Sequence, residues 1–458
     1  MKVAVIGGGV TGLAAAYRLQ TLGFEPIVYE AAPRIGGVAG TERRSGFLAE
    51  TGPNSLATPK PAAAALFTEL GLAERLLEAS PTARRRYVVR EGRLVPLPLS
   101  PIELLTSPVL SPGAKLRLLR EPFIPPSDPA IDESIADFIR RRFGPEPLAY
   151  VAAPFAAGVY AGDAEALSVR HALARLYALE QDHGSILSGL LAQARAARRG
   201  RAAGVSSRIV SFPNGIGELT EALAQRLGDR ICTGSPVRRV GRDGSGWVVT
   251  TDRGSTAYQG VAFAGPAYAL GEVAFDCDRG ERLPEVAAIP HAPVASVVLG
   301  FPRGAVAHPL DGFGVLVPAV ERRRVLGTLF SSSLFPGRAP DGHVTLTSFV
   351  GGTGQPELVR LGADALIALV REELTELLGA FGDPVFQQVT VWPRAIPQYV
   401  VGYQRWLDLL DEVESANPGL ALAGSYRFGV SLGDALTSGL AAGDRLGLHL
   451  GGAGPSLR

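Results

Sequence analysis

The sequence predicts an α/β protein with α+β insertions, on the evidence of its two ends. Lys2–Ile6 is a short apolar run rich in β-branched residues, as in a buried parallel strand. Glycines interrupt this run, Leu and Ala then recur with helical spacing, and Pro26–Tyr29 has the pattern of a second strand. At the other end, Ala421–Gly424 has the pattern of a strand and Asp434–Gly447 that of a helix. We therefore expect one Rossmann-like domain built from both chain ends, with other domains inserted between them.

The turn after the first strand has the spacing Gly7-x-Gly9-x-x-Gly12. Gly7 permits a tight turn, Gly9 lets the backbone approach a pyrophosphate, and Gly12 lets helix and strand pack closely. The N-terminus of the following helix offers free N–H groups and the positive end of its dipole to phosphates. Glu30 ends the second strand about 20 residues further on, where a carboxylate accepts hydrogen bonds from a ribose. These features together predict a bound adenine dinucleotide.

Two further features favour FAD over NAD. Arg34–Gly37 is a second glycine turn, carries an arginine and follows Glu30 directly, so it extends the cradle along a longer ligand. Gly429–Asp434 leads into the last helix, whose N-terminus would stabilise negative charge on a reduced flavin. Because no cysteine follows Cys277, a thioether link to the C-terminal motif is excluded, and we expect the FAD to be non-covalent.

The segments between the two ends have their own patterns. We expect helices at Pro61–Leu77, from the N-cap Ser134 to Arg142, over most of Ala164–Leu191, and at Ala363–Leu378. We expect a hairpin over Val237–Thr251 that turns around Asp243–Gly246, and strands alternating with turns over Phe313–Val350. Proline-rich Val95–Pro129 predicts turns and short apolar pieces, and Arg195–Arg208 predicts a basic loop.

Composition excludes several classes of protein. With 458 residues, of which 46% are hydrophobic, the chain can bury more than one core, and its length suggests about two to three domains. A net charge of +1 gives no global attraction to nucleic acid. We expect no signal peptide and no spanning helix, since no apolar run approaches about 18 residues. Two distant cysteines and six scattered histidines predict no metal site and a reducing cytoplasm.

Charge is concentrated in the middle of the chain. Arg84–Arg208 holds 18 Lys and Arg against 12 Asp and Glu, a net charge of +6. Proline-broken apolar pieces around Leu94–Ile124 lie beside these basic residues. One hypothesis for this basic segment is that it contacts anionic lipid peripherally on the cytoplasmic face of a membrane. Another is that it favours the more acidic of two possible substrates. The sequence leaves both open, and it leaves monomer and homodimer open.

Motifs that run in order along essentially the whole chain are similar to those of one family. They are GGGVTG, RIGG, AETGPNSL (Ala49–Leu56), GVYAGDAEALSVR (Gly158–Arg170), FPNGIGEL (Phe212–Leu219), GFGVLVP (Gly312–Pro318), FVGG (Phe349–Gly352), AIPQYVVGY (Ala395–Tyr403) and GVSLGD (Gly429–Asp434). On these motifs the chain resembles the oxygen-dependent protoporphyrinogen oxidase family. The resemblance implies six-electron oxidation of a porphyrinogen to a porphyrin in heme biosynthesis, with O2 as acceptor and hydrogen peroxide as product.

The resemblance also implies a fold like that of the amine oxidases, with three domains. The expected FAD-binding domain comprises residues 1–83, 205–265 and 400–458. The expected substrate domain, with a mixed sheet, comprises residues 84–95 and 266–399, and the expected helical, membrane-associating domain comprises residues 96–204.

The family's site residues carry over by motif. The implied cofactor contacts are Gly7, Gly8, Gly9, Val10, Thr11, Gly12, Glu30, Ala31, Arg34, Gly37, Val38, Gly52, Pro53, Asn54, Ser55, Val237, Trp392, Val430, Ser431 and Leu432. For the substrate, an arginine before an apolar strand binds a propionate, and this falls on Arg86, with Arg84 and Arg85 beside it. Gly158 matches a glycine whose carbonyl faces the pyrrole N–H groups. Phe313, Leu316 and Phe349 match apolar walls around the macrocycle. No acid–base triad is implied, since the flavin accepts hydride.

Several alternatives remain at this point. Members of the family act either on protoporphyrinogen IX or on coproporphyrinogen III. We prefer the first substrate, on the character of the motif GTLFSSSLFPGRAP (Gly327–Pro340). A related amine oxidase or carotenoid desaturase is a second reading, although an amine oxidase normally needs an aromatic pair, and Tyr426 offers one half. A third is a non-catalytic protein like the Rab GDP dissociation inhibitors, which the intact glycines argue against. Phe428 and Ala435 depart from residues common in the family, and neither removes a backbone contact.

Overall fold

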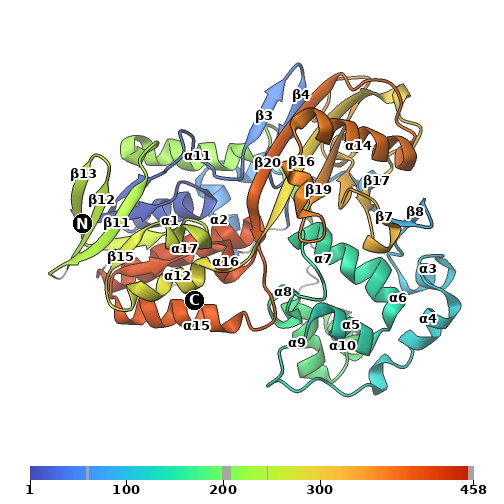
Figure 1. Cartoon of the computed structure of the whole chain (residues 1–458), viewed down its shortest axis with the longest axis horizontal. Coiled ribbons are helices and arrows are strands. Elements are labelled where there is room, and N and C mark those ends of the chain that lie inside the picture. The colour runs from blue at the N-terminus through green and yellow to red at the C-terminus, as the bar shows by residue number, and fades with distance from the viewer. Residues whose placement is uncertain (58–60, 199–207, 245, 452–458) are drawn as a thin grey trace.

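The computed structural model describes residues 1–57, 61–198, 208–244 and 246–451. Figure 1 shows three regions: an α/β region that contains both ends of the chain, a long twisted sheet, and a group of helices coloured teal. Helix α7 of this last group lies nearest the long sheet.

A five-stranded parallel sheet is built from both ends of the chain, as predicted. Its strands, in spatial order, are β10 (Ile231–Cys232), β2 (Glu25–Tyr29), β1 (Lys2–Ile6), β14 (Gly260–Phe263) and β21 (Leu420–Leu422). Val3 and Val5 of β1 enter a core with α1 (Val10–Thr21), α11 (Gly217–Leu227) and α17 (Leu432–His449). Ala4 and Ile6 enter a second core on the opposite face. Burial on both faces explains the unbroken apolar run of β1.

The second face of the parallel sheet is covered by a smaller sheet and two helices. The sheet has the order β13 (Gly254–Tyr258), β12 (Gly246–Thr251), β11 (Val237–Asp243) and β15 (Ala274–Asp276), and the helices are α12 (Leu283–Ala287) and α15 (Gln404–Ala416). The hairpin predicted over Val237–Thr251 is formed by β11 and β12. Residues 274–287 pack here because β15 pairs with β11, although they fall within the predicted substrate domain. The domain boundaries otherwise stay a prediction.

The long sheet has seven strands and mixed directions. Its order is β20 (Phe386–Pro397), β16 (His291–Pro302), β19 (His343–Gly351), β18 (Gly327–Leu329), β17 (Gly312–Leu316), β7 (Arg85–Arg90) and β8 (Arg93–Pro96). Only the β17–β7 pairing in it is parallel among the described strands. Helix α14 (Ala363–Leu378), found at its predicted bounds, covers one face, where Ala295, Val297 and Leu299 of β16 are buried. We call the opposite face the site face.

The helical module, residues 101–198, lies beyond the site face (Figure 1). Its helices are α3 (Pro101–Thr106), α4 (Pro112–Leu118), α5 (Ile135–Arg142), α6 (Pro145–Pro147), α7 (Ala153–Tyr160), α8 (Val169–Ala172), α9 (Ala174–His183) and α10 (Ile186–Arg198). Ser134 caps α5 by accepting a hydrogen bond from the Asp137 N–H, as predicted. Fully buried Arg142 bonds Glu121 and Glu180, which ties the proline-rich segment to α9. No helix among the described residues is both long and apolar enough to cross a bilayer.

Three predicted segments differ from the structure. The helix expected at Pro61–Leu77 ends as α2 at Glu69, because Gly71 adopts a φ of +72° and the chain continues into β6 (Leu77–Glu78). Within Val95–Pro129, capping by Ser100 and Ser111 turns parts of the expected loop into α3 and α4. Helix α10 continues to Arg198 where a loop was expected, and residues 199–207 of that segment lie outside the described residues.

Candidate active site

The first glycine turn connects β1 to α1, and its glycines have different structural reasons. A Cβ on Gly7, whose φ is +108°, would meet the Ala264 backbone at 2.9 Å, and a Cβ on Gly12 would overlap the Gly7 carbonyl oxygen. A Cβ on Gly9 would meet no described atom within 4 Å. The fold therefore requires Gly7 and Gly12, whereas Gly9 leaves space at the helix N-terminus for a ligand to approach. Among the described residues no side chain caps α1, so its first N–H groups suit a pyrophosphate.

The Glu30 carboxylate is held at the end of β2 by two backbone bonds. Its Oε2 accepts from the Gly8 N–H at 2.6 Å and its Oε1 from the Ala32 N–H at 2.7 Å. Each carboxylate oxygen can accept a further bond, so the group stays able to bind ribose hydroxyls. The Glu30 carbonyl accepts from the Ser235 N–H at 2.8 Å, which brings the start of β11, with the buried Val237, beside Glu30 and Ala31.

The second glycine turn packs directly on the first. The Gly36 N–H donates to the Gly8 carbonyl at 2.8 Å, and a Cβ on Gly37 would lie 3.4 Å from the Gly9 Cα. Arg34 and Val38 are exposed beside this contact. The structure thus brings together two turns that helix α1 and strand β2 separate in the sequence.

The predicted loop Gly52–Ser55 lies next to the second turn. The Thr51 hydroxyl donates to the Val38 carbonyl at 3.2 Å, and the Asn54 amide donates to the Gly52 carbonyl at 3.0 Å. The Trp392 indole N–H donates to the Thr51 carbonyl at 2.6 Å, which joins this loop to β20 of the long sheet. Thr51 is a junction that the sequence reasoning did not single out, although it lies inside a quoted motif.

The closing helix α17 begins beside α1. The Thr11 hydroxyl donates to the Ala435 carbonyl at 3.0 Å, and Ser431 caps α17 by accepting from the Asp434 N–H at 3.1 Å. Val430, Ser431 and Leu432 therefore lie at the start of α17, close to Gly9–Thr11 at the start of α1. The N-termini of the two helices therefore lie together, as the predicted cradle from both chain ends requires, and Figure 1 shows α1 and α17 side by side.

A buried carboxylate supports the loop that carries Thr51. Glu50 ends β4 (Phe47–Glu50), which pairs with β3 (Thr41–Arg44). It accepts from the Thr41 hydroxyl at 2.5 Å and the Ile216 N–H at 3.0 Å, and lies 3.7 Å from the Arg338 guanidinium. Burial outweighs these favourable contacts and raises the pKa of Glu50 to about 7.

Three of the predicted substrate residues, Arg86, Leu316 and Phe349, lie on the site face of the long sheet. Leu316, Gly327 and Phe349 form one row across β17, β18 and β19. Arg86 is in the next row, opposite Gly314. Side chains in directly paired positions point to the same face, so Arg86, Leu316 and Phe349 share it with Trp392. Phe313 lies 5.3 Å from the Arg86 guanidinium, measured from the ring centroid.

Helix α7 covers the middle of the site face. A Cβ on Gly158 would lie 2.7 Å from the Leu316 side chain. Ala161, just after the helix, packs in one cluster with Phe349. The backbone of α7 can therefore approach the site face closely because residue 158 has no side chain.

Two of the three neighbouring arginines, Arg85 and Arg86, differ in their partners. Arg85 points to the other face, where it pairs with Asp311 at 2.5 Å, and Tyr87 donates to the same carboxylate at 2.7 Å. Hydrogen bonding with Tyr87, followed by the charge of Asp311, raises the pKa of Arg85, and the hydrogen bond from Tyr87, with a smaller contribution from the charge of Arg85, holds the pKa of Asp311 below its ordinary value. Arg86 is exposed on the site face, with Phe313 beside it. Asp311 gave no signal in the sequence, since it becomes a partner only through the β17–β7 pairing.

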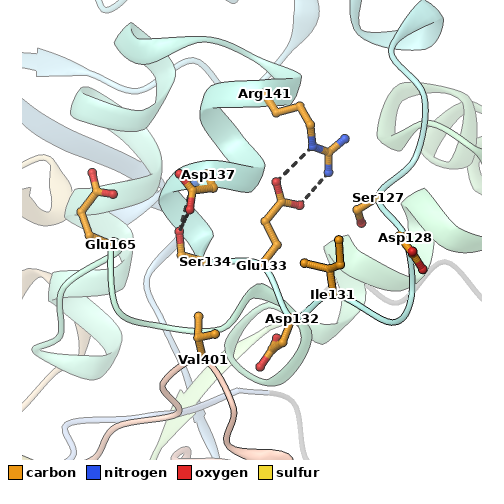
Figure 2. A pocket seen from close by; sticks show the side chains of 10 residues that line it. All are labelled: Ser127, Asp128, Ile131, Asp132, Glu133, Ser134, Asp137, Arg141, Glu165 and Val401. Atoms are coloured by element: carbon orange, nitrogen blue, oxygen red, sulfur yellow. Dashed lines mark hydrogen bonds and ion pairs between the residues drawn. The ribbon is translucent and has the colours of Figure 1, made fainter.

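A cavity of about 470 Å³ lies elsewhere, in the helical module (Figure 2). Its lining includes Asp132, Glu133, Asp137 and Glu165, with Arg141 bonded to Glu133. It includes none of the predicted site residues. We therefore place the candidate site at the glycine turns and the site face, which contain the predicted residues, and not at this cavity.

Comparison with known proteins decides the family. The profile of flavin-containing amine oxidoreductases matches residues 10–446. This chain belongs to that family. Protoporphyrinogen oxidase 2 of Arabidopsis thaliana is 33% identical over 97% of this chain and 93% of its own length. Coproporphyrinogen III oxidase of Bacillus subtilis is 29% identical, covering 96% of each chain.

Solved structures agree with the family assignment. A crystal structure from Exiguobacterium sp. 255-15, assigned as a protoporphyrinogen oxidase, superposes with a TM-score of 0.83 at 25% identity over 98% of this chain and 99% of that one. A reduced UDP-galactopyranose mutase shares the fold, with a TM-score of 0.73 at 17% identity over 98% of this chain and 94% of that one.

Membership in the family confirms the predicted fold class, the flavin-dependent oxidoreductase and its FAD cofactor. The described residues fit FAD, because the space at Gly9, the Glu30 carboxylate and two helix N-termini lie together. The individual contacts, the non-covalent attachment and the membrane association of the helical module stay predictions.

Proposed function

We propose that this chain oxidises a porphyrinogen to the corresponding porphyrin, with protoporphyrinogen IX as preferred substrate and O2 as the electron acceptor that yields hydrogen peroxide. The observation that carries the proposal is the site face, where an exposed arginine and apolar side chains lie together under α7. The relatives at 33% identity are named protoporphyrinogen oxidases, which supports it.

The chain's own residues bind and orient the substrate. Arg86 would form charge-assisted hydrogen bonds with a propionate, and Phe313, Leu316 and Phe349 would pack against the macrocycle. The Gly158 carbonyl would accept from pyrrole N–H groups, because α7 lies over Leu316. When bound, FAD supplies the two-electron acceptor of each oxidation step.

Two observations support this substrate over the alternatives. Tyr426 is fully buried in the core, so it does not flank an exposed site in the way an amine oxidase would need. Arg85 is already paired with Asp311, which leaves Arg86 beside an apolar ring and suits a substrate with few carboxylates. The more acidic alternative, coproporphyrinogen III, carries two more propionates.

A comparison of substrates tests the proposal. The purified protein should be yellow and convert protoporphyrinogen IX into fluorescent porphyrin with a higher kcat/KM than coproporphyrinogen III. A higher value for coproporphyrinogen III would reverse the substrate preference. Rapid oxidation of amines without oxidation of either porphyrinogen would contradict the proposal as a whole.

A pair of arginine variants tests the binding mode. Arg86→Ala should raise KM by about 10- to 100-fold with a smaller change in kcat, because a hydrogen bond to a charged group contributes about 1.5–3 kcal/mol. Arg85→Ala removes the same charge from the other face and should leave KM nearly unchanged. Equal effects of both substitutions would assign the role of Arg86 to general electrostatics.

We also propose that this protein is cytoplasmic and contacts a membrane peripherally. The contact would be made through α3, α4 and the turn after them, Leu119–Phe123. Leu105, Leu119 and Phe123 are 72%, 68% and 86% exposed there, beside Lys115 and Arg117. Both cysteines are free thiols in the part of the chain that the structure describes, which supports a reducing compartment.

A further inference from the structure

Tyr399 lies between the helical module and the start of α17, in the segment that follows β20. It is 5% exposed, and its ring packs on those of Tyr403 and Tyr160, with centroids 4.5 and 6.0 Å away. Its hydroxyl accepts a hydrogen bond from the Gly429 N–H at 2.8 Å and donates one to the Ser425 carbonyl. One buried hydroxyl therefore bonds both ends of the turn Ser425–Gly429.

This turn is preceded by one glycine and ends on another, and both have unusual conformations that leave its direction to be fixed by contacts from outside. Gly424 has a φ of +152° and Gly429 a φ of +129°, values that glycine adopts more easily than other residues. Gly429 is followed directly by Val430–Leu432, where α17 begins. The direction of the α17 N-terminus thus depends on how the turn before it is held.

The residue before Tyr399, Gln398, bonds the end of α7, the helix that covers the site face. Gln398, 2% exposed, donates from its side-chain amide to the Tyr160 carbonyl at 2.8 Å and to the Ile396 carbonyl at 2.9 Å. Tyr160 is the last residue of α7, the helix that carries Gly158. Gln398 thus holds the end of α7, and Tyr399 holds the turn that leads into α17.

We propose that Tyr399 is a positioning residue for the flavin and that Gln398 is a positioning residue for the substrate. The Tyr399 hydroxyl fixes the turn Ser425–Gly429, so that the N–H groups at the start of α17 stabilise negative charge on the reduced cofactor. The Gln398 amide fixes the end of α7, which sets the distance of Gly158 from the site face. The Tyr399 part rests on the family's flavin, and only the Gln398 part rests on the proposed function.

Tyr399→Phe in the holoenzyme tests the first part. The variant should bind reduced FAD about tenfold less tightly relative to oxidised FAD, which lowers the two-electron midpoint potential by about 30 mV. Tyr160→Phe is the matched control, because it removes a similarly buried hydroxyl that donates to the Ala172 carbonyl at 2.9 Å and to neither end of the turn. A potential for Tyr399→Phe equal to that of the control would overturn the proposal.

Gln398→Met should give the opposite pattern. It keeps the length of the side chain, loses the bond to Tyr160, and should raise the KM for the porphyrinogen several-fold with the flavin potential unchanged. If Tyr399→Phe and Gln398→Met changed KM by the same factor and also changed the flavin potential by the same amount, the site would be loosened generally. That result would contradict the division of roles between the two residues. If neither porphyrinogen is a substrate, the potentials still decide the Tyr399 part.

Hydrogen exchange on the unmodified holoenzyme gives an independent measurement. The Gly429 amide should exchange slowly because the Tyr399 hydroxyl accepts its hydrogen bond. Fast exchange at this amide would overturn the proposal even if Tyr399→Phe failed to fold.

Discussion

Single glycines in the first turn separate ligand binding from folding. Gly9→Ala should give a stable protein that retains little FAD, because residue 9 has a φ of −75°, its Cβ meets no described atom, and the added methyl would occupy the space of the pyrophosphate. Absorbance of bound flavin and thermal unfolding of the same sample measure the two effects.

Gly12→Ala is the matched substitution three residues away. Its Cβ would overlap the Gly7 carbonyl oxygen, so the strand and helix must separate and the free energy of unfolding should fall by about 1–3 kcal/mol. If Gly9→Ala kept its flavin, or lost as much stability as Gly12→Ala, the assignment of Gly9 to the pyrophosphate would be wrong.

Glu50 predicts a pH dependence of stability. Its pKa rises from an ordinary 4.5 to about 7 in the folded protein, so the folded state binds more protons between these values. The stabilising contribution is complete below pH 4.5 and is lost as pH rises through 7, by up to about 3 kcal/mol. Glu50→Gln should therefore flatten the fall in the free energy of unfolding over this range, measured by denaturant titration at several pH values.

Glu42→Gln is the control for Glu50, since Glu42 is an exposed carboxylate on the neighbouring strand β3. It should leave the pH dependence of the free energy of unfolding as in the unmodified protein. A slope that Glu50→Gln does not change would mean that Glu50 is ionised in the folded state at acidic pH.

Elements with strong local signals could be predicted from the sequence. Helix α14 has its predicted bounds because Gly379 ends it with a φ of +61°, and α5 begins after Ser134 because that hydroxyl caps it. The helix expected at Pro61–Leu77 is shorter, since apolar spacing continued past Gly71 although the backbone did not. Periodicity alone cannot show where a chain turns to pair with another strand such as β9 (Ile209–Ser211).

Helix α17 gives an element-scale prediction through its contact with α1. A Cβ on Gly439 would overlap the Thr11 carbonyl oxygen, so Gly439→Ala should push the two helices apart. We expect the free energy of unfolding to fall by about 1–3 kcal/mol and FAD to dissociate more readily, since both helix N-termini move. Denaturant titration and flavin release measure these effects.

Gly433→Ala controls for the change of residue type in the same helix. Its Cβ would lie 3.9 Å from the Ser431 hydroxyl oxygen, an ordinary contact, so the free energy of unfolding without FAD should stay the same or rise by a few tenths of a kcal/mol. A loss of stability as large as that of Gly439→Ala would refute the steric argument.

At the scale of the whole molecule, the sequence could suggest the site residues but not their arrangement. The resemblance indicated Arg86 and Phe313 separately, and the parallel pairing of β7 with β17 brings them together across more than 200 residues. The same pairing places Asp311 beside Arg85 and so distinguishes two adjacent arginines. The alternation of a strand can fix which side chains face the core, but it does not show which distant strand will be its partner.

The exposed apolar residues of the helical module predict membrane binding that a double substitution should abolish. The holoenzyme should sediment with vesicles that contain anionic lipid, and Leu119→Glu with Phe123→Glu should weaken binding by at least about tenfold, because each buried apolar side chain contributes about 1.5–3 kcal/mol. Phe381→Glu with Val385→Glu is the matched control, since these residues are 62% and 56% exposed and their N–H groups bond Ala305 and Gly300 at the end of β16 in the long sheet. Because Lys115, Arg117 and Arg120 accompany the apolar residues, binding should also weaken with salt and with neutral lipid. A protein that does not bind anionic vesicles, or a control pair that weakens binding equally, would contradict a membrane contact through α3, α4 and the turn after them.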